Sequence, residues 1–250
     1  MSERAVSEVV SYVLVFGLVV SAVGIVSVSG LGTLQDTRND EQMANAERAF
    51  SVLADNLADV HRRDAPSRAT EISLGEARLE TAANVTMRIS VTDTGGDTWQ
   101  SEQWSIRPLV YSGDEGRKLV YEAGAVYRTS NGGGIRVQNP PFVVTQDRVL
   151  LSVVGLNRPD RQALSGSTVL IRARRQSTSL AYNSTADDVD SVTVGIRDTP
   201  RTELWQEYLL SVGFDGCSVS GNDIQCTFDP GSPISQTYVV YHDIAVDIES

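Results

Sequence analysis

The stretch from Val9 to Gln35 reads VVSYVLVFGLVVSAVGIVSVSGLGTLQ, and none of its 27 residues carries a charge. As an α-helix it would be about 40 Å long, and the hydrocarbon core of a bilayer is about 30 Å thick. A run of this length and composition is typical of a membrane-spanning helix or of a processed leader. This stretch therefore predicts an apolar N-terminal helix that is distinct from the rest of the fold.

Two interpretations of this helix follow from general targeting rules. A secretory signal peptide would be cleaved near Ser27–Ser29, but its apolar region would exceed the usual length of about 7–15 residues. A plain signal anchor fits the charges better, because Arg4 precedes the apolar run and Asp36 and Asp40 follow it. That distribution favours an N-terminus that faces the cytoplasm.

A third interpretation rests on the order of the first residues. A polar leader, Met1–Ala5, is followed by Val6-Ser7-Glu8-Val9-Val10 and then by the apolar run. This order resembles the class III signal of type IV pilins and archaellins, and it is most similar to haloarchaeal pilin-like proteins. The resemblance implies that a prepilin peptidase cuts between Ala5 and Val6. Residues 1–5 would then be the leader, and the mature subunit would keep residues 6–35 as its transmembrane helix.

The resemblance also suggests which residues would take part in helix assembly. Many pilins have an acidic residue fifth after the cut, whereas here Val10 is fifth and Glu8 is third. An unpaired charge in lipid is costly, so we expect Glu8 to pair with the new α-amino group of a neighbouring subunit. Gly17, Ser21 and Gly24 share one helix face, which would let helices approach closely. The alternative is that these small residues are incidental in a lone anchor.

An amphipathic helix is predicted over residues 36–64. Its apolar residues recur at intervals of three and four, which places them on one stripe: Met43, Ala46, Phe50, Leu53, Leu57 and Val60. His61 and Arg62 near its end suit the negative pole of a helix. Gly30 and Gly32 mark a point where the apolar and amphipathic parts could separate into two helices.

The composition is acidic, with 32 Asp and Glu against 21 Lys and Arg and a formal net charge of -11. This balance argues against a nucleic-acid partner. Lys118 is the single lysine, so arginine supplies the other basic side chains. The pattern resembles proteins of extreme halophilic archaea, in which concentrated salt screens the repulsion between acidic groups.

Residues 66–250 are predicted to form an extracytoplasmic β-rich domain. Val85, Met87 and Ile89 alternate with polar residues, as in a strand with one buried face. A second strand holds Trp104 and Ile106, and further strands are expected at Leu109–Tyr111, Lys118–Tyr121, Ala125–Arg128, Arg148–Val154, Ser167–Arg174, Ser191–Ile196 and Tyr238–Ile248. The fold class is therefore α+β, a long N-terminal helix followed by a mainly antiparallel sandwich or meander.

One short helix is predicted near residues 200–212. Thr199 is its expected N-cap, Pro200 its first residue, and Gly213 its end. Its apolar stripe is expected to pack on the sheet as core and not to line a binding groove. The segments Val120–Arg128 and Asn139–Phe142 resemble the ectodomain of a haloarchaeal pilin-like family of unknown function.

Cys217 and Cys226 are predicted to form a disulfide. The residues between them read as a hairpin with Gly221-Asn222 as its turn, and pairing outward places the two cysteines opposite each other. Opposed strand residues have Cα atoms about 4.5–5.5 Å apart, within disulfide range. A disulfide implies an oxidising, extracytoplasmic setting, and two buried free thiols are the alternative.

The sequence gives no indication of an enzyme, a metal or a cofactor. His61 and His242 are far apart in the chain, and a phosphate loop ending in Gly-Lys-Ser or Gly-Lys-Thr is absent. Two sequons, at Asn84 and Asn183, could be glycosylated on an extracytoplasmic domain.

The sequence leads to the hypothesis of a membrane-anchored, pilin-like surface protein that is a major or minor subunit of an archaeal type IV pilus-like filament. Its partners would be the membrane, prepilin peptidase and other pilin-like subunits. The alternative is a single-pass membrane protein whose β-rich module binds a ligand and does not polymerise.

Overall fold

The computed structural model describes residues 3–131, 133–157, 163–166, 168–186 and 188–249, with the side chains of residues 3–9 and 28–33 left outside this description. The chain divides into two compact units, Met1–Ala44 and Asn45–Ser250. We call them the anchor unit and the head.

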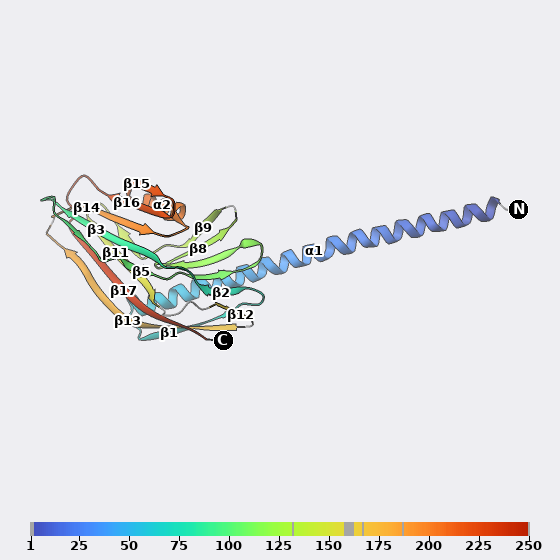
Figure 1. Cartoon of the computed structure of the whole chain (residues 1–250), viewed down its shortest axis with the longest axis horizontal. Helices are drawn as coiled ribbons and strands as arrows, with labels where there is room; N and C mark the ends of the chain where they lie inside the picture. Colours follow the sequence, from blue (N-terminus) through green and yellow to red (C-terminus); the bar gives the residue numbers. More distant parts are fainter. Residues whose placement is uncertain (1–2, 132, 158–162, 167, 187, 250) are drawn as a thin grey trace. The chain divides into compact units, whose positions relative to one another are not determined.

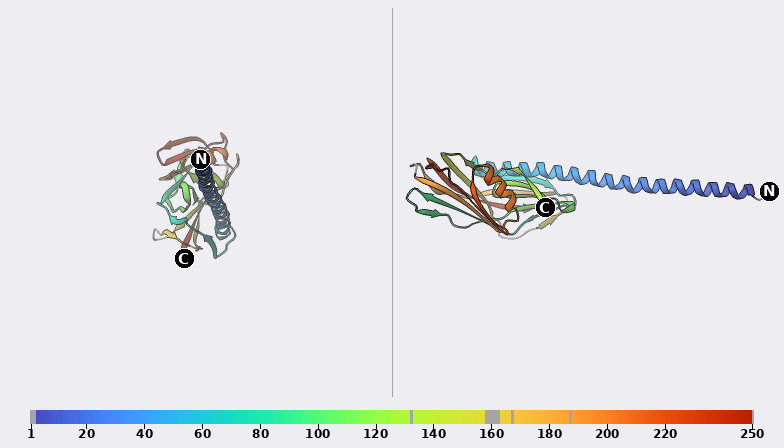
Figure 2. Two further views of the ribbon diagram at one scale, coloured as in Figure 1. Left: turned by 90° about the vertical axis from the view of Figure 1, so that its right-hand side faces the viewer. Right: turned by 90° about the horizontal axis from the view of Figure 1, so that it is seen from above.

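A single helix, α1 (Glu3–Arg62), accounts for the N-terminal part of the chain. Its ribbon is unbroken in Figures 1 and 2, so the separation considered at Gly30 and Gly32 does not occur. A glycine inside a helix costs about 1 kcal/mol relative to alanine but, unlike proline, keeps its N–H for the helical hydrogen bond. Leu31, Leu34 and Gln35 favour a helix, and α1 continues through the two glycines.

The head contains three β-sheets (Figure 1). Sheet A has the strand order β1-β13-β17-β11-β10. Its strands are β1 (Ser67–Ser73), β13 (Thr168–Ser184), β17 (Gln236–Glu249), β11 (Arg148–Asn157) and β10 (Phe142–Val144). The pairing of β11 with β17 is parallel, whereas the other pairings in this sheet are antiparallel. The strand expected from Ser167 is β13, and Ser167 itself lies outside the described residues.

Sheet B is antiparallel, with the order β12-β2-β6-β7-β8-β9. Its strands are β12 (Ala163–Ser165), β2 (Arg78–Thr81), β6 (Leu109–Ser112), β7 (Lys118–Glu122), β8 (Ala125–Ser130) and β9 (Gly133–Gln138), and a 3-10 turn, η1 (Asp114–Gly116), precedes β7. Ala123 and Gly124 link β7 to β8 with φ of 52° and 90°. Two positive φ values are what the tightest hairpin turn requires.

Sheet C has the order β15-β16-β14-β3-β4, and β5 also pairs with β3. Its strands are β15 (Asp215–Ser220), β16 (Asp223–Phe228), β14 (Val189–Arg197), β3 (Val85–Asp93), β4 (Thr98–Gln100) and β5 (Trp104–Ile106). Val85, Met87, Ile89 and Val91 are buried, and the residues between them are less so. The predicted alternation is confirmed, as is the mainly antiparallel α+β class.

The second helix, α2 (Thr202–Ser211), packs against the strands and contributes to the main core. Leu204, Trp205, Tyr208 and Leu209 are buried, which confirms the predicted core stripe. The helix begins at Thr202, two residues later than expected, and its N-cap is Arg201, so the prediction of Thr199 as the N-cap was wrong. The Thr199 hydroxyl donates to the buried Glu122 carboxylate, and residues 200–201 form a turn.

The C-terminal part of α1, from Asn45 onward, belongs to the head. Its predicted stripe is buried there, at Ala46, Phe50, Leu53, Leu57 and Val60. The Phe50 ring meets Tyr111 of β6 edge-on, with ring centroids 6.3 Å apart. On the side facing β1, Asn56 Nδ2 donates to Thr70 Oγ1 at 2.9 Å. This part of α1 is therefore an internal helix of the head.

Candidate functional site: an exposed apolar helix

The segment Val10–Ser27 of α1 is the candidate membrane span. Its mean hydropathy is 2.3, it contains 18 residues, and no part of it is buried. It is the one segment among the described residues that meets the criteria of helix length and apolar composition. The result supports single-pass anchoring and leaves its sidedness as a prediction.

Most of the large apolar side chains that are exposed among the described residues belong to this segment. Tyr12, Leu18 and Val26 are 72%, 71% and 70% exposed, and the Tyr12 and Phe16 rings stack on one side of the helix. Soluble proteins rarely expose contiguous apolar patches larger than a few hundred Å². Covering such a surface with lipid or another helix would be favourable by about 25 cal/mol of free energy per Å² of apolar surface buried.

The predicted assembly residues can be located in part. Gly17, Ser21 and Gly24 are exposed on α1. A Cβ atom added at Gly17 or Gly24 would meet nothing within 4 Å, so no contact within the described chain requires a glycine at either position. The processing site at Ala5 and Val6, and the Glu8 carboxylate, have side chains outside the described residues.

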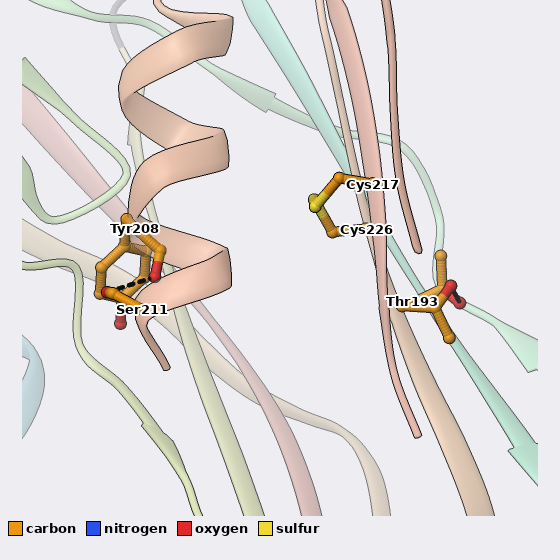
Figure 3. The surroundings of a disulfide bond; sticks show 6 residues. Thr193, Tyr208, Ser211, Cys217 and Cys226 are labelled. Carbon is orange, nitrogen blue, oxygen red and sulfur yellow. Dashed lines mark hydrogen bonds between the residues drawn. A yellow bond between two sulfur atoms is a disulfide. The ribbon is translucent and has the colours of Figure 1, made fainter. Parts of the chain in front are cut away.

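The disulfide prediction is confirmed. Cys217 and Cys226 join the β15–β16 hairpin, with an S–S bond of 2.05 Å and Cα atoms 4.1 Å apart (Figure 3). Residues of β15 and β16 pair outward from the predicted turn, with Ser220 opposite Asp223 and Ser218 opposite Gln225. Cys226 faces the core and is fully buried.

The two sequon asparagines lie on the surface of the head. Asn84 precedes β3, and its Oδ1 accepts a hydrogen bond of 3.0 Å from Arg107 Nε. Asn183 belongs to β13 and pairs with Tyr238 of β17. Both side chains are exposed, so glycosylation stays a prediction at each.

His61 and His242, which are distant in the sequence, lie side by side in the head. Their ring centroids are 5.0 Å apart, and the His242 ring nitrogens are 2.9 Å from Ser152 Oγ and 3.1 Å from Thr178 Oγ1. Their separation along the chain therefore gave no indication of this contact. α1 and β17 bring them together through the tertiary fold, and no local spacing encodes such a contact.

Burial governs the chemistry of this pair. It lowers the pKa of His61 to about 3, with smaller contributions from His242 and Arg62. It also lowers the pKa of His242 to about 4, again with Arg62 nearby. Both rings are therefore neutral at pH 7. Among the described residues, no group of three His, Cys, Asp or Glu side chains could hold a metal ion.

A second polar cluster lies beneath α2. Glu122 Oε1 accepts hydrogen bonds from Trp205 Nε1 at 2.7 Å and from Thr199 Oγ1 at 3.0 Å. Glu122 Oε2 pairs with the guanidinium of Arg201. Both carboxylate oxygens of Glu122 have partners, and among the described residues only Arg201 Nε of this cluster is buried without a hydrogen bond. The cluster therefore holds α2 against β7.

The sequence model of one family matches residues 4–247, and that family is described as "Family of unknown function (DUF7289)". No curated protein and no solved structure matches the chain.

Proposed function

We propose that this chain, which belongs to the family DUF7289, is a pilin-like surface protein that the apolar part of α1 anchors in the membrane. The observation that carries the proposal is the Val10–Ser27 segment, which has 18 residues with a mean hydropathy of 2.3, none of them buried. At 1.5 Å per residue it is about 27 Å long, close to the hydrocarbon thickness of a bilayer.

The head suits an extracytoplasmic location. Cys217 and Cys226 form a disulfide, and such bonds persist in oxidising compartments. The charges flanking the apolar run, Arg4 before it and Asp36 after it, favour the same orientation. The head would therefore lie outside the cell, with the N-terminus in the cytoplasm.

The step from anchor to filament subunit rests on the helix surface and on the resemblance to class III signals. After cleavage between Ala5 and Val6, the retained apolar helix could pack against copies of itself. Gly17, Ser21 and Gly24 place three small residues on one face of that helix. The Glu8 carboxylate would be neutralised by the α-amino group of a neighbouring subunit.

A second candidate function is a single-pass membrane protein that does not polymerise and whose head binds a ligand. It is favoured by a polar hollow on the outer face of sheet C, lined by Arg88 and Arg197 and free of acidic residues.

Membrane fractionation and N-terminal sequencing of the full chain test the proposal together. We expect the protein in the membrane or in sheared filaments, with a mature N-terminus at Val6. A start at Met1 or Ser2 would favour the plain anchor and remove the pilin-like processing. A soluble protein that starts near Gly30 would overturn membrane anchoring altogether.

A further inference from the structure

The outer face of sheet C carries a hollow of about 240 Å³. Three neighbouring strands form its floor, with Arg88 of β3 opposite Gly195 of β14 and Gly195 opposite Gln225 of β16. Gly195 has no side chain, whereas its two neighbours have long polar ones. The depression arises because the central residue of this row ends at the backbone.

Two arginines line the hollow. Arg88 and Arg197 are diagonal neighbours across β3 and β14, since Gly195 faces Arg88 and Arg197 faces Thr86. Diagonal neighbours in a sheet are about 7–8 Å apart, within reach of one ligand held between long side chains. Both are exposed, and in the described part of the chain neither guanidinium forms an ion pair.

The charge of this hollow contrasts with that of the whole chain. The protein has 32 acidic residues against 21 basic ones, yet none of the lining residues is Asp or Glu. Two positive guanidiniums with no carboxylate in the lining of the hollow repel each other and attract an anion. Arginine favours carboxylates and other oxyanions because its planar fork can donate two parallel hydrogen bonds.

The remaining lining supplies neutral hydrogen-bonding groups. Gln100, Gln103 and Gln225 offer amides, and Thr86, Ser90 and Thr193 offer hydroxyls. Each of these groups can both donate and accept, as sugar hydroxyls do. The hollow is smaller than the roughly 300–1,000 Å³ of sites for drug-sized ligands, so it has room for a single small ring.

We propose that the Arg88–Arg197 hollow on sheet C binds a carboxylated sugar unit, that is, a uronic acid residue of an acidic saccharide. The guanidiniums pair with the carboxylate, and the amides and hydroxyls bond the ring hydroxyls. This site would let the head recognise acidic saccharide at a surface, whether or not α1 polymerises.

Binding of glucuronate to the full chain in detergent micelles tests the proposal, with calorimetry or ligand-observed NMR at one fixed salt concentration. Glucose is the matched neutral probe, and inorganic sulfate is the anion without a sugar. We expect glucuronate to bind with Kd on the order of 1 mM, which suits a ligand of this size in an open site. Glucose and sulfate should bind at least about tenfold more weakly, because glucose lacks the carboxylate and sulfate lacks the ring hydroxyls.

Variants connect that binding to the hollow. Arg88→Gln and Arg197→Gln should each weaken glucuronate binding by about tenfold, the usual effect of losing a charge-assisted hydrogen bond. Gly195→Leu should abolish binding by filling the hollow; a Cβ at Gly195 meets the Arg88 carbonyl oxygen at 3.7 Å, an ordinary contact. Arg172→Gln on β13, an exposed arginine of sheet A, is the matched control and should bind as the wild type does.

Three results would overturn the proposal. Equal binding of glucose and glucuronate would remove the role of the arginines. Equal binding of sulfate and glucuronate would reduce the hollow to a plain anion site. Unchanged glucuronate binding by the Arg88→Gln and Arg197→Gln variants, with thermal unfolding like that of the wild type, would place the sugar elsewhere.

Discussion

Glu122 and Arg201, 79 residues apart in the chain, form an ion pair in which the Glu122 side chain is completely buried and that of Arg201 is 9% exposed. β7 contributes the acid and the turn before α2 contributes the base. Taking two charges out of water is expensive, and the cost is offset only while both partners are present. The pair therefore fixes α2 in a single position on sheet B.

We predict that Glu122→Gln destabilises the head by about 3–5 kcal/mol, the usual cost of leaving a buried charge without its partner. The glutamine oxygen can still accept the hydrogen bonds from Thr199 and Trp205, so the loss comes from the side that faces Arg201, where an amide NH2 group replaces the charged oxygen. Denaturant unfolding in detergent, followed by tryptophan fluorescence, measures the change.

Glu203→Gln is the control, because Glu203 is an exposed acid on the same helix and its replacement should change stability by less than about 0.5 kcal/mol. In a double-mutant cycle, Glu122→Gln with Arg201→Gln should cost less than the sum of the two single variants. Additive losses would mean that the two charges do not depend on each other.

The Cys217–Cys226 disulfide should stabilise the β15–β16 hairpin measurably. It joins residues nine apart, and closing a loop of about ten residues restricts the unfolded chain by roughly 2–3 kcal/mol. The variant in which both cysteines become alanine should lose about that amount under oxidising conditions. Reductant should lower the unfolding temperature of the wild type but not that of the variant. A wild type indifferent to reductant would contradict a structural role for this bond.

Strands were predictable from sequence where alternate residues are apolar and buried, as in Val85–Val91. The same pattern is weak in β1, where the inward residues are Thr70 and Ile72 and one of them is polar. The second half of β13 is exposed from Arg175 to Leu180 and shows no alternation at all. It is a strand because β17 pairs with it along its length. Pairing partners of this kind lie outside any local window of sequence.

The candidate sites differ in the same way. The apolar run of α1 and the Cys217–Cys226 hairpin are local features, so their residues and spacing were sufficient to predict them. The His61–His242 contact and the Arg88–Arg197 hollow need α1, β3, β14 and β17 in their folded positions. Arg88 lies on the polar face of one predicted strand and Arg197 directly follows another, but their diagonal register depends on how β3 pairs with β14.

Acid should destabilise the head through His61. Its pKa is lowered from 6.5 to about 3 by burial, so the folded state keeps the ring neutral where the unfolded chain protonates it. The unfolded state then binds more protons, and stability falls as the pH drops from about 6.5 towards 3. The slope approaches about 1.4 kcal/mol per pH unit for one such group.

The variant His61→Phe tests this contribution. It keeps a ring beside His242 and removes Nδ1, a buried atom without a hydrogen-bond partner among the described residues. We expect stability at pH 7 to be unchanged or slightly higher, and the loss between pH 6.5 and 4 to be smaller than in the wild type. Since the carboxylates are the same in both proteins, their contribution cancels. Parallel pH profiles for the two proteins would show that His61 does not titrate on unfolding.

Gly17→Leu separates an assembling helix from a lone anchor. A Cβ atom added at Gly17 meets nothing within 4 Å in the described chain, and leucine favours a helix over glycine by up to about 1 kcal/mol, so the monomer should fold and insert normally. If copies of α1 pack through the Gly17–Gly24 face, the larger side chain forces them apart, and sheared surface filaments should disappear while membrane-bound protein remains. Val19→Leu is the matched control, because Val19 lies on the opposite face of the helix and is 50% exposed. Filaments that persist in Gly17→Leu, or that vanish equally in both variants, would show that the small residues form no helix interface.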